Sequence, residues 1–345
     1  MAMEPALKRW LLIAYGAGAV VLVAIVAYYG LGTISLAVLG AGWGLLGVML
    51  VHVAQLSFLG AAWRALIPAR PRPSVAAFFR LRWIREAVNN LLPVAQIGGE
   101  IVGTRLLARH AVPLGLAGAT ATVDLTVEMV TQILFTLAGL GLLLVGPHDG
   151  ALSSWVVGGL AMALLAAAAF VAAQRFGLFK LIELGLVRLA ERWPGLSLHG
   201  IKGLHDSVGT VHANRRGLLE GAACHGASWA LGAVEVAVAL AALGHPVGLR
   251  EAFVIESLGA ALRSAGFAVP GALGIQEAAL ILVCSPFGVP AETAVALSMV
   301  KRVREFAFGL PGLVAWQWSE GRRLAGARPS PARGVESMPT STRGS

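Results

Sequence analysis

Long apolar stretches separated by short polar turns dominate the chain. A helix needs about 20 predominantly apolar residues to cross a bilayer. We predict spanning helices over residues 10–31, 36–59, 116–145, 153–173, 218–243 and 291–318. Because only helices or closed barrels satisfy their backbone groups in lipid, this pattern predicts an all-α polytopic membrane protein with about six transmembrane helices.

Two further apolar stretches are each interrupted by proline and glycine and closed by an acid. They read NNLLPVAQIGGE, residues 89–100, and AGFAVPGALGIQE, residues 265–277. The apolar run before each proline is too short to span a membrane. We therefore predict two broken re-entrant hairpins, over about residues 86–107 and 251–284; counting each hairpin as a full span gives eight helices instead. Their distinctive positions are Pro93, Gly98, Gly99 and Glu100 in the first, and Pro270, Gly274 and Glu277 in the second.

The two broken stretches share one register with the helices that follow them. Pro93 and Pro270 are separated by a certain number of residues, which we call the repeat offset. The same number of residues separates Glu100 from Glu277, Asp124 from Lys301, and Glu128 from Glu305. We predict repeat halves over about residues 82–145 and 256–318, although a chance alignment of glycine-rich segments is the alternative. Three spans separate the hairpins, so they enter from opposite sides. That arrangement is an inverted repeat, as in secondary transporters.

Charge is scarce and unevenly placed. Only 13% of the residues are charged and 57% are hydrophobic, which excludes an ordinary soluble domain. Most lysines and arginines lie near the N-terminus, in residues 64–109 and 174–216, or after residue 318. The positive-inside rule then places both termini in the cytoplasm. The net charge of +9 thus reflects topology, and no nucleic-acid partner is expected.

Two regions flank the predicted membrane core. Residues 64–85 contain six arginines and no acid, and we predict either an interfacial amphipathic segment or a plain cytoplasmic loop. Residues 319–345 are rich in serine, proline and arginine. We predict one membrane domain over residues 1–318, followed by a disordered cytoplasmic tail over residues 319–345.

Several ionisable residues fall inside the predicted spans and hairpins, where an ionisable side chain indicates function by default. They are Glu100, Asp124, Glu128, Glu235, Arg263, Glu277, Lys301, Arg304 and Glu305. Asp124 and Glu128 lie one turn apart, and we expect this acidic helix to face the basic helix of Lys301 and Arg304. Capture by a neighbouring arginine is the structural alternative for Glu235. His52 and Gln55 are expected to form an interhelical hydrogen bond or to contact a substrate.

No sequence signature of a catalytic or metal site is present. The chain lacks HExxH, GxSxG and P-loop patterns. Its two cysteines lie in apolar runs without CxxC spacing, and the histidines of residues 174–216 lack acids or cysteines at ligand spacing. We therefore expect no metal, no cofactor and no enzymatic activity.

Two stretches carry a resemblance to a known family. They are NNLLPVAQIGGEIVGTRLL, and VPGALGIQEAAL followed by LSMVKRVREFAFGLPGLVAW. The chain resembles the flippase-like transmembrane region of lysylphosphatidylglycerol synthases over about residues 10–318. RWIREAVNNLLPVAQIGGE and ESLGAALRSAGFAVPGALGIQE are most similar to the stand-alone subfamily encoded with hopanoid biosynthesis enzymes. The resemblance implies a multi-pass protein of the bacterial inner membrane that moves a lipid between leaflets, without an aminoacyl-transferase domain after residue 318.

Three functions remain open from the sequence. The first is a lipid translocator for a hopanoid or phospholipid, whose headgroup passes along the intramembrane charges and the hairpin prolines and glycines. The second is a headgroup transferase that uses the paired carboxylates Asp124 and Glu128. The third is a non-transporting partner of lipid-biosynthesis enzymes, docked through residues 174–216. The lipid, the energy source and the oligomeric state do not follow from the sequence.

Overall fold

The computed structural model describes residues 39–68, 72–92, 98–145, 204–265 and 272–326, and within these ranges every regular element is a helix. The all-α prediction is confirmed. The predicted spans 10–31 and 153–173, most of the segment 174–216, and the hairpin prolines Pro93 and Pro270 lie outside the described residues.

Three described helices are long and apolar enough to cross a membrane. They are α3 (Trp43–Ala65), α6 (Leu114–Val145) and α10 (Arg215–Ala242), with 23, 32 and 28 residues. A fourth long helix, α13 (Ala291–Gly326), has 36 residues but carries a group of charged side chains in its first half. These four helices correspond to the predicted spans 36–59, 116–145, 218–243 and 291–318. α13 continues beyond residue 318, where the tail was predicted to begin.

Each predicted hairpin is a pair of shorter helices. The first consists of α4 (Val75–Leu91) and α5 (Gly98–Ala108). The second consists of α11 (Leu249–Ala265) and α12 (Ile275–Cys284), which the 3-10 turn Ser285–Phe287 follows. The remaining described helix, α9 (Leu204–Ala213), packs on α6.

The first hairpin begins earlier than predicted, at a capped helix start. The hydroxyl oxygen of Ser74 accepts from the Ala77 N–H at 3.1 Å, satisfying a free amide of the first turn. Arg82 and Arg85 are 6% and 2% exposed, so this half of residues 64–85 lies inside the bundle. The prediction of an interfacial segment or loop is wrong there, because buried acids supply both arginines with partners.

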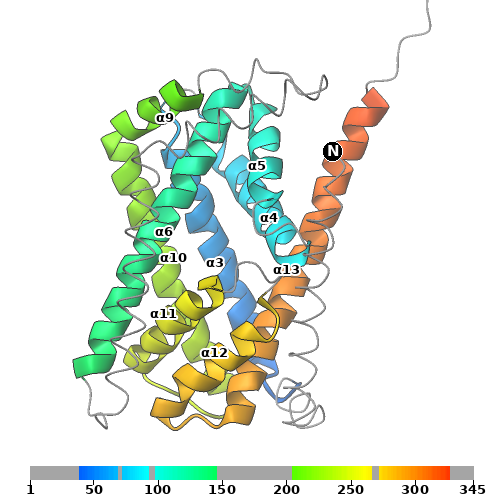
Figure 1. Ribbon diagram of the computed structural model, residues 1–345. Coiled ribbons are helices and arrows are strands. Elements are labelled where there is room, and N and C mark those ends of the chain that lie inside the picture. Colours follow the sequence, from blue (N-terminus) through cyan, green and yellow to red (C-terminus); the bar gives the residue numbers. More distant parts are fainter. Residues whose placement is uncertain (1–38, 69–71, 93–97, 146–203, 266–271, 327–345) are drawn as a thin grey trace, which may run out of the picture.

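The helix boundaries follow the repeat offset. The first residues of α5 and α12 are separated by the repeat offset, and so are the first residues of α6 and α13 and the last residues of α3 and α10. The repeat unit is therefore α3–α4–α5–α6 followed by α10–α11–α12–α13, one helix longer than the predicted halves. Figure 1 shows α4 and α5 in the upper half of the bundle, and α11 and α12 in the lower half. This arrangement agrees with two hairpins that enter from opposite ends.

The equivalent helices α3 and α10 form the most extensive helix contact in the described bundle. Gly44 permits it, because a Cβ there would collide with Ala242. Val48, Leu240, Ile255 and Leu297 join these helices to α11 and α13 in one apolar core, and Trp63, Phe78 and Leu107 form another around α4 and α5. Large apolar side chains elsewhere are exposed, as expected for a surface that faces lipid.

Candidate functional site

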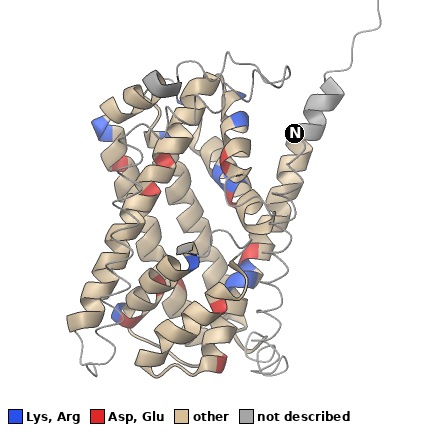
Figure 2. Ribbon diagram, in the orientation of Figure 1, with Lys and Arg blue, Asp and Glu red and all other residues tan. Residues whose placement is uncertain are grey.

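Charged residues lie on the helices at two levels, near each hairpin (Figure 2). Charges are costly in a low-dielectric interior unless they are paired and hydrogen-bonded. Among the residues that the structure describes, the charged ones with less than 9% exposure are Arg82, Arg85, Asp124, Glu235, Glu277, Lys301, Arg302, Arg304 and Glu305. Each of them has an ion-pair partner.

The hairpin-one network contains Arg82, Arg85, Glu100, Asp124, Glu128 and His225. Arg82 binds Glu128 through both terminal nitrogens, Nη2 to Oε1 at 2.7 Å and Nη1 to Oε2 at 3.0 Å. Arg85 donates from Nη1 to Asp124 Oδ2 and from Nε to Glu100 Oε1, both at 2.6 Å. α4 thus supplies the positive charges that hold the acids of α5 and α6.

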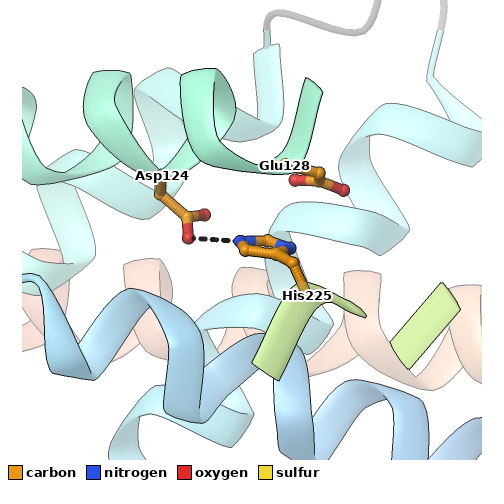
Figure 3. A group of neighbouring side chains, drawn as sticks. All are labelled: Asp124, Glu128 and His225. Atoms are coloured by element: carbon orange, nitrogen blue, oxygen red, sulfur yellow. Dashed lines mark hydrogen bonds and ion pairs between the residues drawn. The ribbon is translucent and has the colours of Figure 1, made fainter. Parts of the chain in front are cut away.

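His225 of α10 completes this network. Its Nε2 lies 3.0 Å from Asp124 Oδ1, and both side chains are fully buried (Figure 3). Asp124 therefore joins α6 to α4 through Arg85 and to α10 through His225. Three buried polar atoms of the network, Glu100 Oε2, Arg82 Nε and His225 Nδ1, have no hydrogen-bond partner among the described residues.

Asp124, Glu128 and His225 each place one potential ligand atom within 4.8 Å of the others. Such a set can hold a divalent cation in principle. Here, however, guanidinium groups bind Asp124 Oδ2 and both Glu128 oxygens. A cation would have to compete with two fixed positive charges, so we assign these carboxylates to ion pairing.

The hairpin-two network contains Glu235, Glu256, Arg263, Glu277, Lys301, Arg302, Arg304 and Glu305. Arg304 Nη1 lies 2.5 Å and 2.6 Å from the two oxygens of Glu235. Lys301 Nζ donates to Glu256 Oε2 at 2.6 Å, and Arg263 pairs with Glu305 at 2.8 Å. The four cations and four acids come from α10, α11, α12 and α13.

The acids that close the two hairpins have comparable surroundings. Glu277 accepts from Ser298 Oγ at 2.7 Å and from Arg302 Nε at 3.0 Å, and it also accepts from the N–H of Gly274 at 2.8 Å. Gly274 has φ +77°, which suits glycine. Glu100 likewise occupies the first turn of its helix and binds an arginine. The predicted equivalence of these two acids is visible in their contacts.

Three polar residues of α3 and α4 lie near both networks, because Glu86 is within electrostatic range of Arg82 and of Arg304. His52 Nε2 lies 3.2 Å from Glu86 Oε1. The Gln55 side-chain amide donates to His52 Nδ1 at 3.1 Å and to Glu235 Oε2 of α10 at 2.9 Å, and its oxygen accepts from the Gly232 N–H of α10 at 3.1 Å. His52 and Gln55 thus form a hydrogen bond to each other within α3. His52 also contacts α4, and Gln55 also contacts α10. We call His52, Gln55 and Glu86 the linking group.

The predicted charge compensation across the pseudo-axis is wrong. Asp124 and Glu128 pair with arginines of α4, whereas Lys301 pairs with Glu256 of α11. Glu305 pairs with Arg263 of α11. The acids of α6 are neutralised mainly by α4, and Lys301 and Glu305 of α13 by α11, so these charges pair with a hairpin helix of their own half. For Glu235, capture by Arg304 is the geometry observed.

The sequence predictions missed part of the site. The missed residues are His52 and Gln55 as linking residues, Arg82, Arg85, Glu86, His225, Glu256 and Arg302. One signal was available: the repeat offset carries Glu86 to Arg263, so the register extends into α4. The pairing partners themselves are distant in sequence and carry no local pattern.

The helices and the buried network define a multi-pass membrane protein with a charged interior. The chain belongs to the family described as the lysylphosphatidylglycerol synthase TM region, whose model matches residues 11–312. Comparisons with curated proteins and with solved structures found no match. The family relates this membrane protein to lipid modification or transport.

Proposed function

We propose that the protein moves a membrane lipid, a hopanoid or a phospholipid, between the leaflets of a bacterial inner membrane. The observation that supports this proposal most is that a buried network of charged residues lies beside each hairpin. Glu86 of the linking group is within electrostatic range of Arg82 in the hairpin-one network and of Arg304 in the hairpin-two network. Polar residues near the midplane of inverted repeats are typical substrate sites of secondary transporters.

The chemistry of the two networks suits a polar headgroup. Arginines can bind a phosphate, and carboxylates can accept from hydroxyl groups. The unpartnered Glu100 Oε2 and Arg82 Nε offer one acceptor and one donor beside the first hairpin. The apolar tails would remain in the bilayer against the exposed apolar faces. In this proposal the protein is not an enzyme, needs no cofactor, and has both termini in the cytoplasm.

We predict that Glu100→Gln, Glu277→Gln and Arg304→Ala each abolish transport. Each change removes one charge of a buried pair and so alters a network without altering the lipid-facing surface. The measurement is the movement of labelled phosphatidylglycerol, and separately of a labelled hopanoid, in proteoliposomes that contain equal amounts of monodisperse protein. Glu220→Gln is the matched control, because Glu220 forms an exposed pair with Arg216. Full transport by all three variants would contradict a role of the networks in transport and favour a non-transporting partner of lipid-biosynthesis enzymes.

A second prediction concerns the orientation of the hairpins. Single cysteines introduced near Pro93 and near Pro270, in a chain without Cys224 and Cys284, are expected to react from opposite sides of the membrane. The measurement is labelling by a membrane-impermeant maleimide in oriented vesicles. Labelling of both positions from one side would exclude the inverted repeat.

A further inference from the structure

The two charged networks are not buried evenly. Glu128 is the most exposed member of the hairpin-one network as defined above, with 21% of its side-chain surface exposed. Arg263 is the most exposed member of the hairpin-two network, with 24%. Glu128 lies on α6 and Arg263 on α11, and these two helices pack against each other (Figure 1). Both networks therefore become accessible on the same pair of helices.

A hydrogen-bonded polar pair lies between these two charges. Gln132 Nε2 of α6 donates to Ser264 Oγ of α11 at 2.7 Å and to the carbonyl oxygen of Ala260 at 3.3 Å. Because a carbonyl oxygen can only accept, it fixes the orientation of the Gln132 amide. Gln132 lies one helical turn after Glu128, and Ser264 directly follows Arg263. The pair is therefore next to the accessible charge of each network.

The exposure of this pair distinguishes it from a second hydrogen bond between the same helices. Thr136 Oγ1 donates to the carbonyl oxygen of Ser257 at 3.4 Å, and both residues are buried. A Cβ on Gly139 would collide with Ser257 Oγ, so α6 and α11 are tightly packed there. Ser264, by contrast, is exposed and Gln132 is half-buried. The contact between the two helices is thus closed at Ser257 and accessible at Ser264.

An accessible polar pair within a membrane span calls for a polar partner. Gln132 lies near the middle of α6, and polar side chains at such depths almost always face the protein interior or a water-filled cavity. The Gln132 amide oxygen and the Ser264 hydroxyl hydrogen have no further hydrogen-bond partner among the described residues. A lipid headgroup supplies both donors and acceptors, and the neighbouring guanidinium of Arg263 suits a phosphate.

We propose that the Gln132–Ser264 pair is the lateral entrance through which a phospholipid headgroup passes from the membrane into the bundle, and that Gln132, Ser264 and Arg263 bind it there. This proposal rests on the proposed function and specifies where the lipid enters and to which class it belongs. The headgroup replaces the hydrogen bond between the two side chains and binds to both. Its phosphate contacts Arg263, whose guanidinium Glu305 holds in place. Glu128, one turn away, is the next polar contact.

The first experiment detects the headgroup without a transport assay. Full-length protein in phosphatidylcholine nanodiscs receives a small fraction of phosphatidylglycerol with a diazirine on its headgroup, and mass spectrometry locates the label after illumination. We expect label on residues 128–136 and 257–264. The double variant Gln132→Leu with Ser264→Ala is expected to lose about tenfold of this label, because two hydrogen bonds to the headgroup are gone. A probe with the diazirine at the end of an acyl chain should label the exposed Leu134 equally in both proteins.

A third probe tests the class of lipid. It has the same headgroup, but an uncharged ether linkage replaces the phosphate. We expect it to label the same residues several-fold more weakly, because Arg263 has no anion to bind. Equal labelling by the two headgroup probes would overturn the assignment to phospholipids. Headgroup label that the double variant leaves unchanged would overturn the entrance.

The second experiment tests passage through the entrance. In proteoliposomes the double variant is expected to move labelled phosphatidylglycerol about tenfold more slowly at an unchanged melting temperature. Thr136→Val is the matched control, because it removes the buried hydrogen bond between the same helices. Ser57→Ala is a second control, because Ser57 is exposed and its Oγ donates to the carbonyl oxygen of Val53 in its own helix at 2.8 Å. Both controls should transport at the wild-type rate. An equal loss of rate in Thr136→Val would show that the polar pair only joins the helices.

The two experiments separate the proposal from the proposed function. An unchanged transport rate in the double variant would overturn the entrance and leave the translocator intact. Site-specific headgroup labelling of a protein that moves neither phosphatidylglycerol nor a hopanoid would refute the translocator and the entrance together, and would leave Gln132 and Ser264 as a lipid-binding pair alone.

Discussion

Replacing Arg304 with leucine is expected to lower the free energy of unfolding by about 3–5 kcal/mol, the cost of leaving a buried charge without its partner. Glu235 is 1% exposed, and Arg304 Nη1 contacts both of its oxygens. The change therefore leaves a buried carboxylate without the guanidinium that contacts both of its oxygens. Reversible denaturation in mixed detergent micelles measures this difference.

Two further variants separate the buried charge from the pair itself. The double variant Glu235→Leu with Arg304→Leu is expected to regain most of the lost stability, because apolar residues of similar volume replace a buried ion pair at little cost. Arg216→Leu breaks an exposed pair and is expected to change stability by about 1 kcal/mol or less. Equal losses in the single and double variants would show that the pair does not stabilise the bundle through its charges.

Replacing Gly99 with alanine is expected to destabilise the protein by about 1–3 kcal/mol, the usual cost of overpacking. A Cβ at this position would collide with the Arg85 carbonyl oxygen and with Asn89 Oδ1. Asn89 accepts from the Gly99 N–H at 2.8 Å, so the α4–α5 hairpin closes at this contact. Because Arg85 also holds Glu100 and Asp124, we expect transport to fall together with stability.

The matched control for this change is Gly226→Ala. A Cβ at Gly226 meets no atom within 4 Å, and the residue lies inside α10. Alanine is preferred over glycine in a helix by about 1 kcal/mol, so this variant should be as stable as the wild type or more stable. Destabilisation of both variants to the same extent would show that the loss at Gly99 does not arise from its close approach to Arg85 and Asn89.

The hairpins and long helices were predictable because their signals are local. Proline and glycine interrupt an apolar run, and an acid follows at the same distance in both copies. The repeat offset then located the second half of the structure from the first. The burial of α4 was not predictable in this way. Arg82 and Arg85 meet their acids on α6, far along the chain, only in the folded bundle.

It was harder to predict which charged residues pair with each other than which residues belong to the site. The sequence places Asp124 and Lys301 at equivalent positions, which suggested that their helices neutralise each other. In the bundle each instead meets a charge on a hairpin helix, Arg85 for Asp124 and Glu256 for Lys301. Equivalent positions in a repeat are related by symmetry, and symmetry does not require them to touch. Intramembrane charge indicated only some of the residues in the two networks, and three-dimensional packing determines the partners.

The contact between α3 and α10 has a consequence for biosynthesis. α3 leaves the ribosome one repeat offset before its partner, and at about 5–20 residues per second the delay is roughly 10–35 s. During that interval Gln55 has no α10 to bond, and Gly44 has no Ala242 to pack against. The first half of the chain must therefore be held in the membrane in an incomplete form until the second half is inserted. Early truncation products should accordingly be substrates for membrane quality-control proteases, although they already contain both arginines and all three acids of the hairpin-one network.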